Sequence, residues 1–265
     1  MDYSKFYMKN KAVYQSIYKF VIALRHPEGG YSDALLVPPG LEDTYCALKT
    51  LKGLGKQDKS QATIDYIKNS AQAGYIRSFK LAYHLAILLQ MYSIKLKPVG
   101  IYKPLLKSRP SSLTDWYYWF MLKKLIDGNI DIDNSLKSWL KKQTPQKLRY
   151  IDEVGRYVLL MQRLKLPFNK KLFIEWLQQM QNSDGGFGVL PYTTTFLEHV
   201  YISLRALKAL RARPLDVDKC EEFVLSCITQ KGGSGRQCVT KPTLEYTYYA
   251  FMSLEIISSW QTNKG

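Results

Sequence analysis

One spacing recurs three times along the chain and limits what the chain can fold into. Two adjacent glycines are followed, 12 residues after the first glycine, by Leu-Glu and a mostly apolar run. The glycine pairs begin at Gly29, Gly185 and Gly232, and the Leu-Glu steps begin at Leu41, Leu197 and Leu244. A spacing kept three times without an insertion indicates an internal repeat, and therefore a structure assembled from similar units.

The apolar runs have the periodicity of helices. In residues 41–55, "LEDTYCALKTLKGLG", leucines and a tyrosine recur every three or four positions. Weaker copies begin at Phe79, Leu113 and Ile151. Between these runs lie helical segments with a polar side, at residues 7–25, 60–73, 99–107, 132–143, 168–181 and 216–229. Prolines and glycines fall between the segments, and no run alternates as a strand does.

The alternation of outer and inner helices predicts the fold. We expect an all-α, closed (α/α)6 toroid of six outer/inner helical hairpins, in a single domain over residues 1–265. The Leu-Glu helices are the more apolar and aromatic, so they are placed inside. An open solenoid needs a polar cap at each end, and the sequence shows no obvious cap.

Composition and charge indicate the cellular setting and the kind of partner to expect. The chain is 46% hydrophobic, enough for a large core, and contains no apolar run of about 18 residues that would predict a membrane span. The N-terminal residues lack an apolar signal core, and the four cysteines form no CxxC pair, so we expect a reduced, cytoplasmic setting. The net charge of +16 suits an acidic partner, and nucleic acid is suggested by charge alone; a solvated lysine-rich surface is the simpler explanation of the charge.

Two stretches of the sequence resemble a known repeat. "NSDGGFG…TTTFLEHVYISLRALKAL" and "HPEGGYS…PPGLEDTYCALKTLKGLG" are similar to the prenyltransferase and squalene oxidase repeat. That repeat builds protein prenyltransferase β subunits and terpenoid cyclases. The resemblance implies a toroid around a central cavity lined by aromatic side chains, with the N-termini of the inner helices at the active site and an isoprenoid as the ligand.

The resemblance also makes the metal site testable. The β subunits carry Asp-x-Cys at the start of the fifth inner helix and a histidine on the sixth, which together bind zinc. The matching positions here are Glu198, Val200 and Tyr246, so only the carboxylate is kept and we expect no zinc site. No cofactor is predicted; Mg²⁺ can bind carboxylates, but no motif demonstrates it. The Asp-x-Asp-Asp acid motif of class II cyclases is matched best by residues 40–43, which end in Glu42 and Asp43.

Acidic side chains begin five of the six inner helices, while the second begins with Lys80. If the helices are parallel, these acids gather at one mouth of a cavity, where like charges raise one another's pKa. We therefore predict Glu42, Asp43 and Asp115 as catalytic candidates, and Glu198 and Glu245 as ligand-binding candidates. The alternative is that each acid only stabilises its own helix N-terminus.

Aromatic side chains follow these acids. Tyr45, Tyr117, Tyr201 and Tyr248 share one position, three residues after the first acid or its equivalent, and Trp119 lies close by on the third inner helix. Aromatic faces pack isoprenoid chains and stabilise carbocations, so these five are predicted to bind ligand. Packing inside the ring is the alternative.

Two functions remain open at this point. In the first, the chain handles an isoprenoid or a similar apolar ligand in a central aromatic cavity without zinc; if it is an enzyme, it is an isoprenoid transferase or a cyclase/isomerase. In the second, it is a non-catalytic toroid that serves as a binding or scaffold module for an acidic partner, a protein assembly or nucleic acid.

Overall fold

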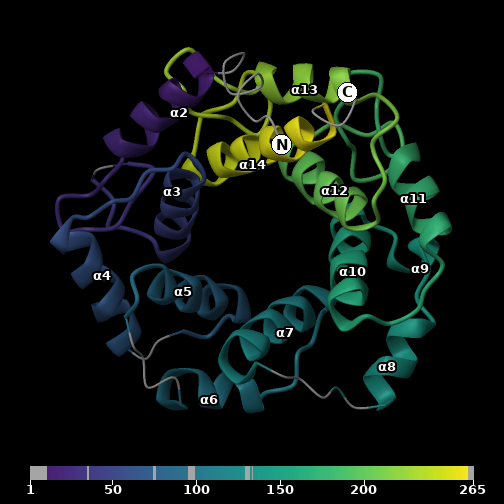
Figure 1. Ribbon diagram of the computed structural model, residues 1–265, viewed down its shortest axis with the longest axis horizontal. Coiled ribbons are helices and arrows are strands. Elements are labelled where there is room, and N and C mark those ends of the chain that lie inside the picture. Colours follow the sequence, from purple (N-terminus) through teal and green to yellow (C-terminus); the bar gives the residue numbers. More distant parts are fainter. Residues whose placement is uncertain are drawn as a thin grey trace. The chain divides into compact units, whose positions relative to one another are not determined.

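The computed structural model in Figure 1 describes residues 11–34, 36–73, 76–94, 99–128, 132 and 134–261. Contacts divide the chain into two compact units: Phe20–Asp131, and Met1–Lys19 together with Ile132–Gly265. The described residues of both units form helices and isolated β-bridges but no strand, as the sequence predicts. None of the described helices combines the length and the apolar character that crossing a membrane requires.

The unit Phe20–Asp131 is built on three inner helices that pack in chain order. They are α3 (Leu41–Gly53), α5 (Phe79–Met91) and α7 (Leu113–Asp127). α5 packs on both α3 and α7, and α4 (Gln61–Gln72) covers it from outside. Tyr102 of the outer helix α6 (Val99–Lys107) is buried with Ala82, Ala86 and Leu122, which joins α6 to α5 and α7.

The other unit repeats this arrangement. Its inner helices are α10 (Ile151–Leu164), α12 (Leu197–Ala209) and α14 (Leu244–Gln261), and α12 packs on both neighbours. The outer helices in this part of the chain are α8 (Asn134–Lys141), α9 (Pro145–Leu148), α11 (Lys170–Gln179) and α13 (Val217–Ser226). α11 packs on α10 and α12, and α13 packs on α14. Helix α2 (Lys11–Ala23) contains the boundary between the units at Lys19.

The predicted helices are confirmed with one addition. All six inner helices begin at the predicted residues, 41, 79, 113, 151, 197 and 244. The outer helices fall within the predicted segments, although residues 7–10 of the first lie outside the described residues. The sequence did not predict α9, a single turn that begins at Pro145, where a proline is favoured.

The glycine pairs explain why the repeat spacing is constant. The first glycine of each pair has φ near +90°, and an added Cβ would lie 2.0–2.2 Å from a backbone carbonyl oxygen of an outer helix. The residue after each pair then accepts a hydrogen bond from the residue before the inner helix, as in Gly40 N–H to Tyr31 O at 3.1 Å. The same bond joins Phe196 to Phe187 and Thr243 to Ser234. Each turn thus fixes where the next inner helix begins.

Candidate functional site

The first predicted acid has a basic partner. Glu42, in the first turn of α3, forms an ion pair with Lys80, in the first turn of α5, and about a third of each side chain is exposed. The one inner helix that begins without an acid therefore supplies the cation for its neighbour. The catalytic role of Glu42 stays a prediction.

The other two catalytic candidates lie on the same unit but in different surroundings. Asp43 lies near Tyr66, whose pKa is raised mainly by burial and further by the charge of Asp43. Asp115 takes part in capping α7: its backbone N–H donates to Ser112 Oγ at 3.0 Å, and its Oδ2 accepts from Ser111 Oγ at 3.0 Å. Asp115 thus lies in the first turn of α7, where a carboxylate is favourable, and its catalytic role also stays a prediction.

An aromatic cluster lies beyond the Glu42–Lys80 pair. The ring of Tyr45 is stacked on the imidazole of His84, with centroids 3.8 Å apart and planes 4° from parallel. Tyr118 meets His84 edge-on at 6.0 Å, and Tyr83 lies 5.9 Å from Tyr118. His84 is buried, and its Nδ1 has no hydrogen-bond partner among the described residues. Burial and the charge of Lys80 lower its pKa to about 3, so the imidazole is neutral at pH 7.

The structure separates the two aromatic candidates of α7. Tyr117 is buried and meets Tyr118 edge-on at 5.1 Å, which connects it to the His84 cluster. Trp119 instead faces α6, where its Nε1–H donates to Leu106 O at 3.2 Å. Lys123 lies 4.8 Å from the Trp119 ring. Trp119 is thus not brought together with Tyr45.

The acids of the other unit are also paired. The Nε of Arg236 donates to Oε1 of Glu198 at 2.7 Å, and the same guanidinium lies 3.6 Å from the Phe196 ring centroid. Asp152, at the start of α10, forms an ion pair with Arg156 one turn further on. Glu245 accepts a hydrogen bond of 2.6 Å from Tyr249. In this unit Glu198 and Asp152 therefore each lie beside an arginine, and Glu245 lies beside a phenol hydroxyl.

Tyrosines of α12 and α14 form a second aromatic cluster. The hydroxyls of Tyr201 and Tyr248 are hydrogen-bonded at 3.0 Å in a buried position. Tyr249 is stacked on Tyr201, with centroids 4.9 Å apart, and the Arg205 guanidinium lies 5.2 Å from the same ring. The arrangement offers aromatic faces together with one cation.

Burial distinguishes two layers in these clusters. The predicted tyrosines form an inner layer, each only 5–8% exposed: Tyr45, Tyr117, Tyr201 and Tyr248. Tyr118 and Tyr249, one residue beyond Tyr117 and Tyr248, are partly exposed, as is Tyr83. Tyr118 and Tyr249 follow the acids in the sequence, but the shared three-residue spacing directed the prediction to their buried neighbours.

Comparison with known proteins adds the family. The model of the prenyltransferase alpha-alpha toroid domain matches residues 4–83 and 153–264. The chain belongs to this family. The match confirms the all-α toroid expectation, while closure by six hairpins stays a prediction.

Two further comparisons were made, with solved structures and with curated proteins. A solved structure, Candida albicans protein geranylgeranyltransferase-I complexed with GGPP, is similar with 12% identity and a TM-score of 0.44; the match covers 95% of this chain and 92% of that chain. A search of curated proteins found no match.

The residues at the positions that the resemblance to protein prenyltransferase β subunits assigns to zinc do not fit zinc. Glu198 is occupied by Arg236, Val200 is fully buried and has no ligand atom, and burial raises the pKa of the Tyr246 phenol. Elsewhere in the described part of the chain, no group of three or more His, Cys, Asp or Glu side chains is arranged to hold a metal ion.

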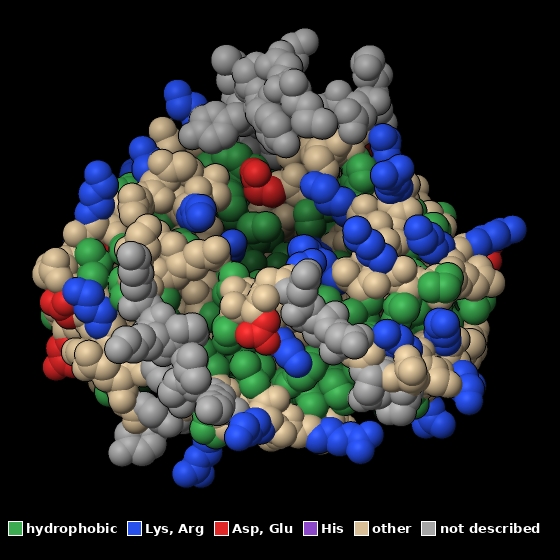
Figure 2. Space-filling view, turned by 60° about the horizontal axis from the view of Figure 1, so that its bottom comes forward, with side chains coloured by type: hydrophobic (Ala, Val, Ile, Leu, Met, Phe, Trp, Pro, Cys, Tyr) green, Lys and Arg blue, Asp and Glu red, His purple; other side chains and the backbone are tan. Residues whose placement is uncertain are grey.

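Basic side chains are spread over the face of the molecule shown in Figure 2. Lys and Arg far outnumber Asp and Glu there, in keeping with the net charge of +16, and they alternate with other residue types. Such a distribution is typical of a solvated surface as well as of a partner for polyanions. An acidic macromolecular partner stays a prediction.

Proposed function

We propose that this protein binds an isoprenoid, or a similar branched apolar ligand, on the aromatic clusters near the N-termini of its inner helices, without zinc. Membership in the toroid family supports the proposal. The observation that carries it is the stack of Tyr249 on Tyr201, in which a partly exposed ring covers a buried one. A ligand that packs on the outer ring gains apolar contact on a surface that is already ordered.

The unit Phe20–Asp131 offers the same layered chemistry. Tyr118 is partly exposed and meets the edge of His84, which is itself stacked on Tyr45. Because His84 is neutral at pH 7, this cluster adds no positive charge against an apolar chain. The unit Phe20–Asp131 therefore offers an apolar chain an aromatic surface of its own.

The ligand's head group is open to test. The acids near the clusters are paired with Lys80, Arg156 and Arg236, so their charges oppose a diphosphate less than isolated carboxylates would. A C15 isoprenoid alcohol and the corresponding diphosphate therefore make a useful pair of probes. Tighter binding of the diphosphate would identify a contribution from these cations.

The decisive experiment is equilibrium binding of both probes, followed by native mass spectrometry and by quenching of intrinsic fluorescence. Tyr249→Ala and Tyr118→Ala should each weaken binding about tenfold, since each removes an aromatic contact surface. Tyr192→Ala is the matched control, because Tyr192 is 99% exposed, and it should leave binding unchanged. A zinc chelator should also have no effect.

Two results would overturn the proposal. Neither probe binding the folded protein would remove the ligand class. Binding that is unaffected by both Tyr249→Ala and Tyr118→Ala would move the ligand away from these clusters. Loss of binding on chelation would contradict the zinc-free part alone.

A further inference from the structure

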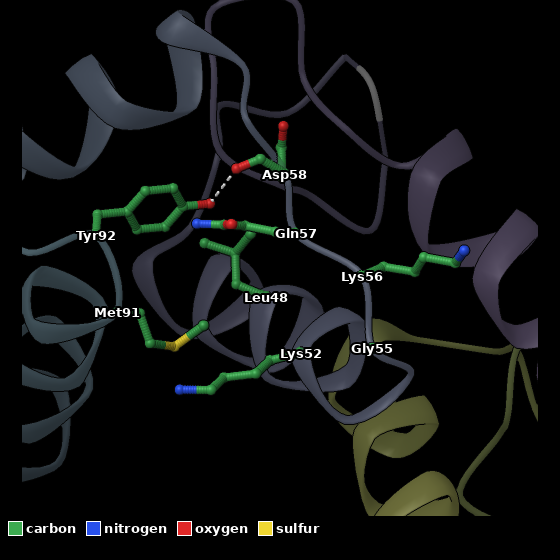
Figure 3. Close-up of a pocket in the computed structure, with 8 residues that line it drawn as sticks. All are labelled: Leu48, Lys52, Gly55, Lys56, Gln57, Asp58, Met91 and Tyr92. Atoms are coloured by element: carbon green, nitrogen blue, oxygen red, sulfur yellow. Dashed lines mark hydrogen bonds between the residues drawn. The ribbon is translucent and has the colours of Figure 1, made fainter.

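A pocket of about 360 Å³ lies at the C-terminal ends of α3 and α5, within the unit Phe20–Asp131. The Glu42–Lys80 pair occupies the opposite, N-terminal ends of the same two helices. Figure 3 shows the residues that line the pocket: Leu48, Lys52, Gly55, Lys56, Gln57, Asp58, Met91 and Tyr92. Its volume is in the range of small-ligand sites.

One side of the pocket is apolar. Leu48 is 2% exposed and so belongs to the packed core, and Met91 is the last residue of α5. Figure 3 shows the Met91 side chain extending toward α3, and the Leu48 side chain pointing toward Tyr92 and Gln57. A flexible thioether beside a fixed leucine suits a short hydrocarbon chain.

The acidic residue of the pocket, Asp58, already has partners outside the pocket. The carboxylate of Asp58 is buried, and it accepts hydrogen bonds from the Tyr31 hydroxyl at 2.8 Å and from the Thr63 hydroxyl at 2.9 Å. Arg25 lies 3.4 Å from its other oxygen and offsets its charge. Only the backbone carbonyl of Asp58 turns to the pocket residues, where it accepts a 2.7 Å bond from Tyr92 (Figure 3).

The negative end of α3 is also capped by the chain itself. Its last carbonyls accept from Leu54 N at 3.0 Å, from Gly55 N at 3.1 Å and from Lys56 N at 2.8 Å. Self-capping of this kind satisfies the carbonyls that would otherwise attract a cation. The positive charge that the pocket offers to a ligand is the ammonium group of Lys52. For Lys52, no carboxylate partner occurs among the described residues.

We propose that this pocket binds a small amphiphilic anion, in which a phosphate or carboxylate head meets Lys52 and a short hydrocarbon chain lies against Leu48 and Met91. The Gln57 amide and the Tyr92 phenol border the same space and add polar edges to it. The site is independent of the aromatic clusters, so either assignment stands if the other fails.

Met91 provides a local reporter for the test. The chain contains 7 methionines, so ¹³C-methyl labelling gives a simple spectrum in which Met91→Leu assigns one signal. Hexyl phosphate and hexanoate should each cause a saturable shift of the Met91 methyl signal. The two anions distinguish the head groups, while hexanol and inorganic phosphate test whether chain and charge are both needed.

Variants then test the role of charge. Lys52→Gln should weaken binding of the better anion at least fivefold, and Lys52→Arg should restore most of it. Lys171→Gln, on a side chain 85% exposed on α11, changes the net charge equally and should have no effect. Three results would each overturn the proposal: no saturable shift with either anion, hexanol binding as tightly as the anions, or full affinity in folded Lys52→Gln protein.

Discussion

The guanidinium of Arg236 is hydrogen-bonded to the carboxylate of Glu198 at the start of α12, where the protein prenyltransferase β subunits that the chain resembles carry a metal-binding aspartate. The charge beside this carboxylate is thus an arginine of the same chain. Its contact with Phe196 fixes the guanidinium from a second side. The guanidinium therefore offsets the charge of the Glu198 carboxylate.

Arg236→Gln should therefore lower the free energy of unfolding by about 1 kcal/mol, because Glu198 Oε2 is already buried without a partner and the change removes the bond to Oε1. Exposure of both side chains keeps the effect modest. Urea unfolding at pH 7 measures it. The double variant with Glu198→Gln should cost less than the sum of the single changes, and strict additivity would show that the pair contributes no coupling.

His84 gives the protein a defined pH dependence. Its pKa is about 3 when folded and near the ordinary value of about 6.5 when unfolded, so the unfolded chain binds the extra proton. Stability should fall as pH drops from about 6.5 toward 3, by about 1.4 kcal/mol per pH unit from this group. His199, whose pKa burial also lowers, adds to the fall in the wild type.

The variant His84→Phe isolates the contribution of His84. Phenylalanine keeps a ring against Tyr45 and has no group to titrate, and the replaced Nδ1 makes no hydrogen bond. Between pH 7 and pH 5 the variant should lose about 2 kcal/mol less stability than the wild type. Equal losses in urea titrations at the two pH values would mean that His84 is not buried as a neutral group.

The helix starts could be predicted from the sequence because local interactions set them. The turn that begins at Gly29 is closed by a hydrogen bond between Tyr31 and Gly40, nine residues apart. The spacing from the glycine pair to the helix start is therefore the same in each copy of the turn. Local spacing of this kind is visible in one sequence. The single domain predicted over residues 1–265 stays a prediction.

The partners of the acids could not be predicted in the same way. Lys80 and Arg236 each lie 38 residues beyond the glutamate that they pair with, on a different repeat. The burial of individual tyrosines could not be predicted either. Tyr248 and Tyr249 are adjacent in the sequence, yet tertiary packing decides which of the two rings is covered. The helical periodicity also does not predict that Trp119 faces α6.

The hydroxyl pair of Tyr201 and Tyr248 should stabilise the α12–α14 contact. Tyr248→Phe removes one buried hydrogen bond and keeps the ring, so the free energy of unfolding should fall by about 1 kcal/mol. Tyr201→Phe should cost a similar amount, and the double variant clearly less than the sum. Tyr192→Phe, at a side chain 99% exposed, serves as the control in urea unfolding. Additive costs would show that the two hydroxyls do not interact.

The last prediction concerns the glycine turn that begins at Gly29, and Gly128 serves as the control position. Gly29 and Gly128 both have positive φ, +89° and +73°, but a Cβ at Gly29 would lie 2.0 Å from Ala62 O, whereas one at Gly128 would meet nothing within 4 Å. Gly128→Ala should cost about 1 kcal/mol, the backbone penalty alone. Gly29→Ala adds a clash with the backbone of α4 that cannot be relieved by moving a side chain, so it should cost about 3 kcal/mol more. Thermal and urea unfolding of the two variants measure the difference, and equal costs would show that close packing on α4 does not select this glycine.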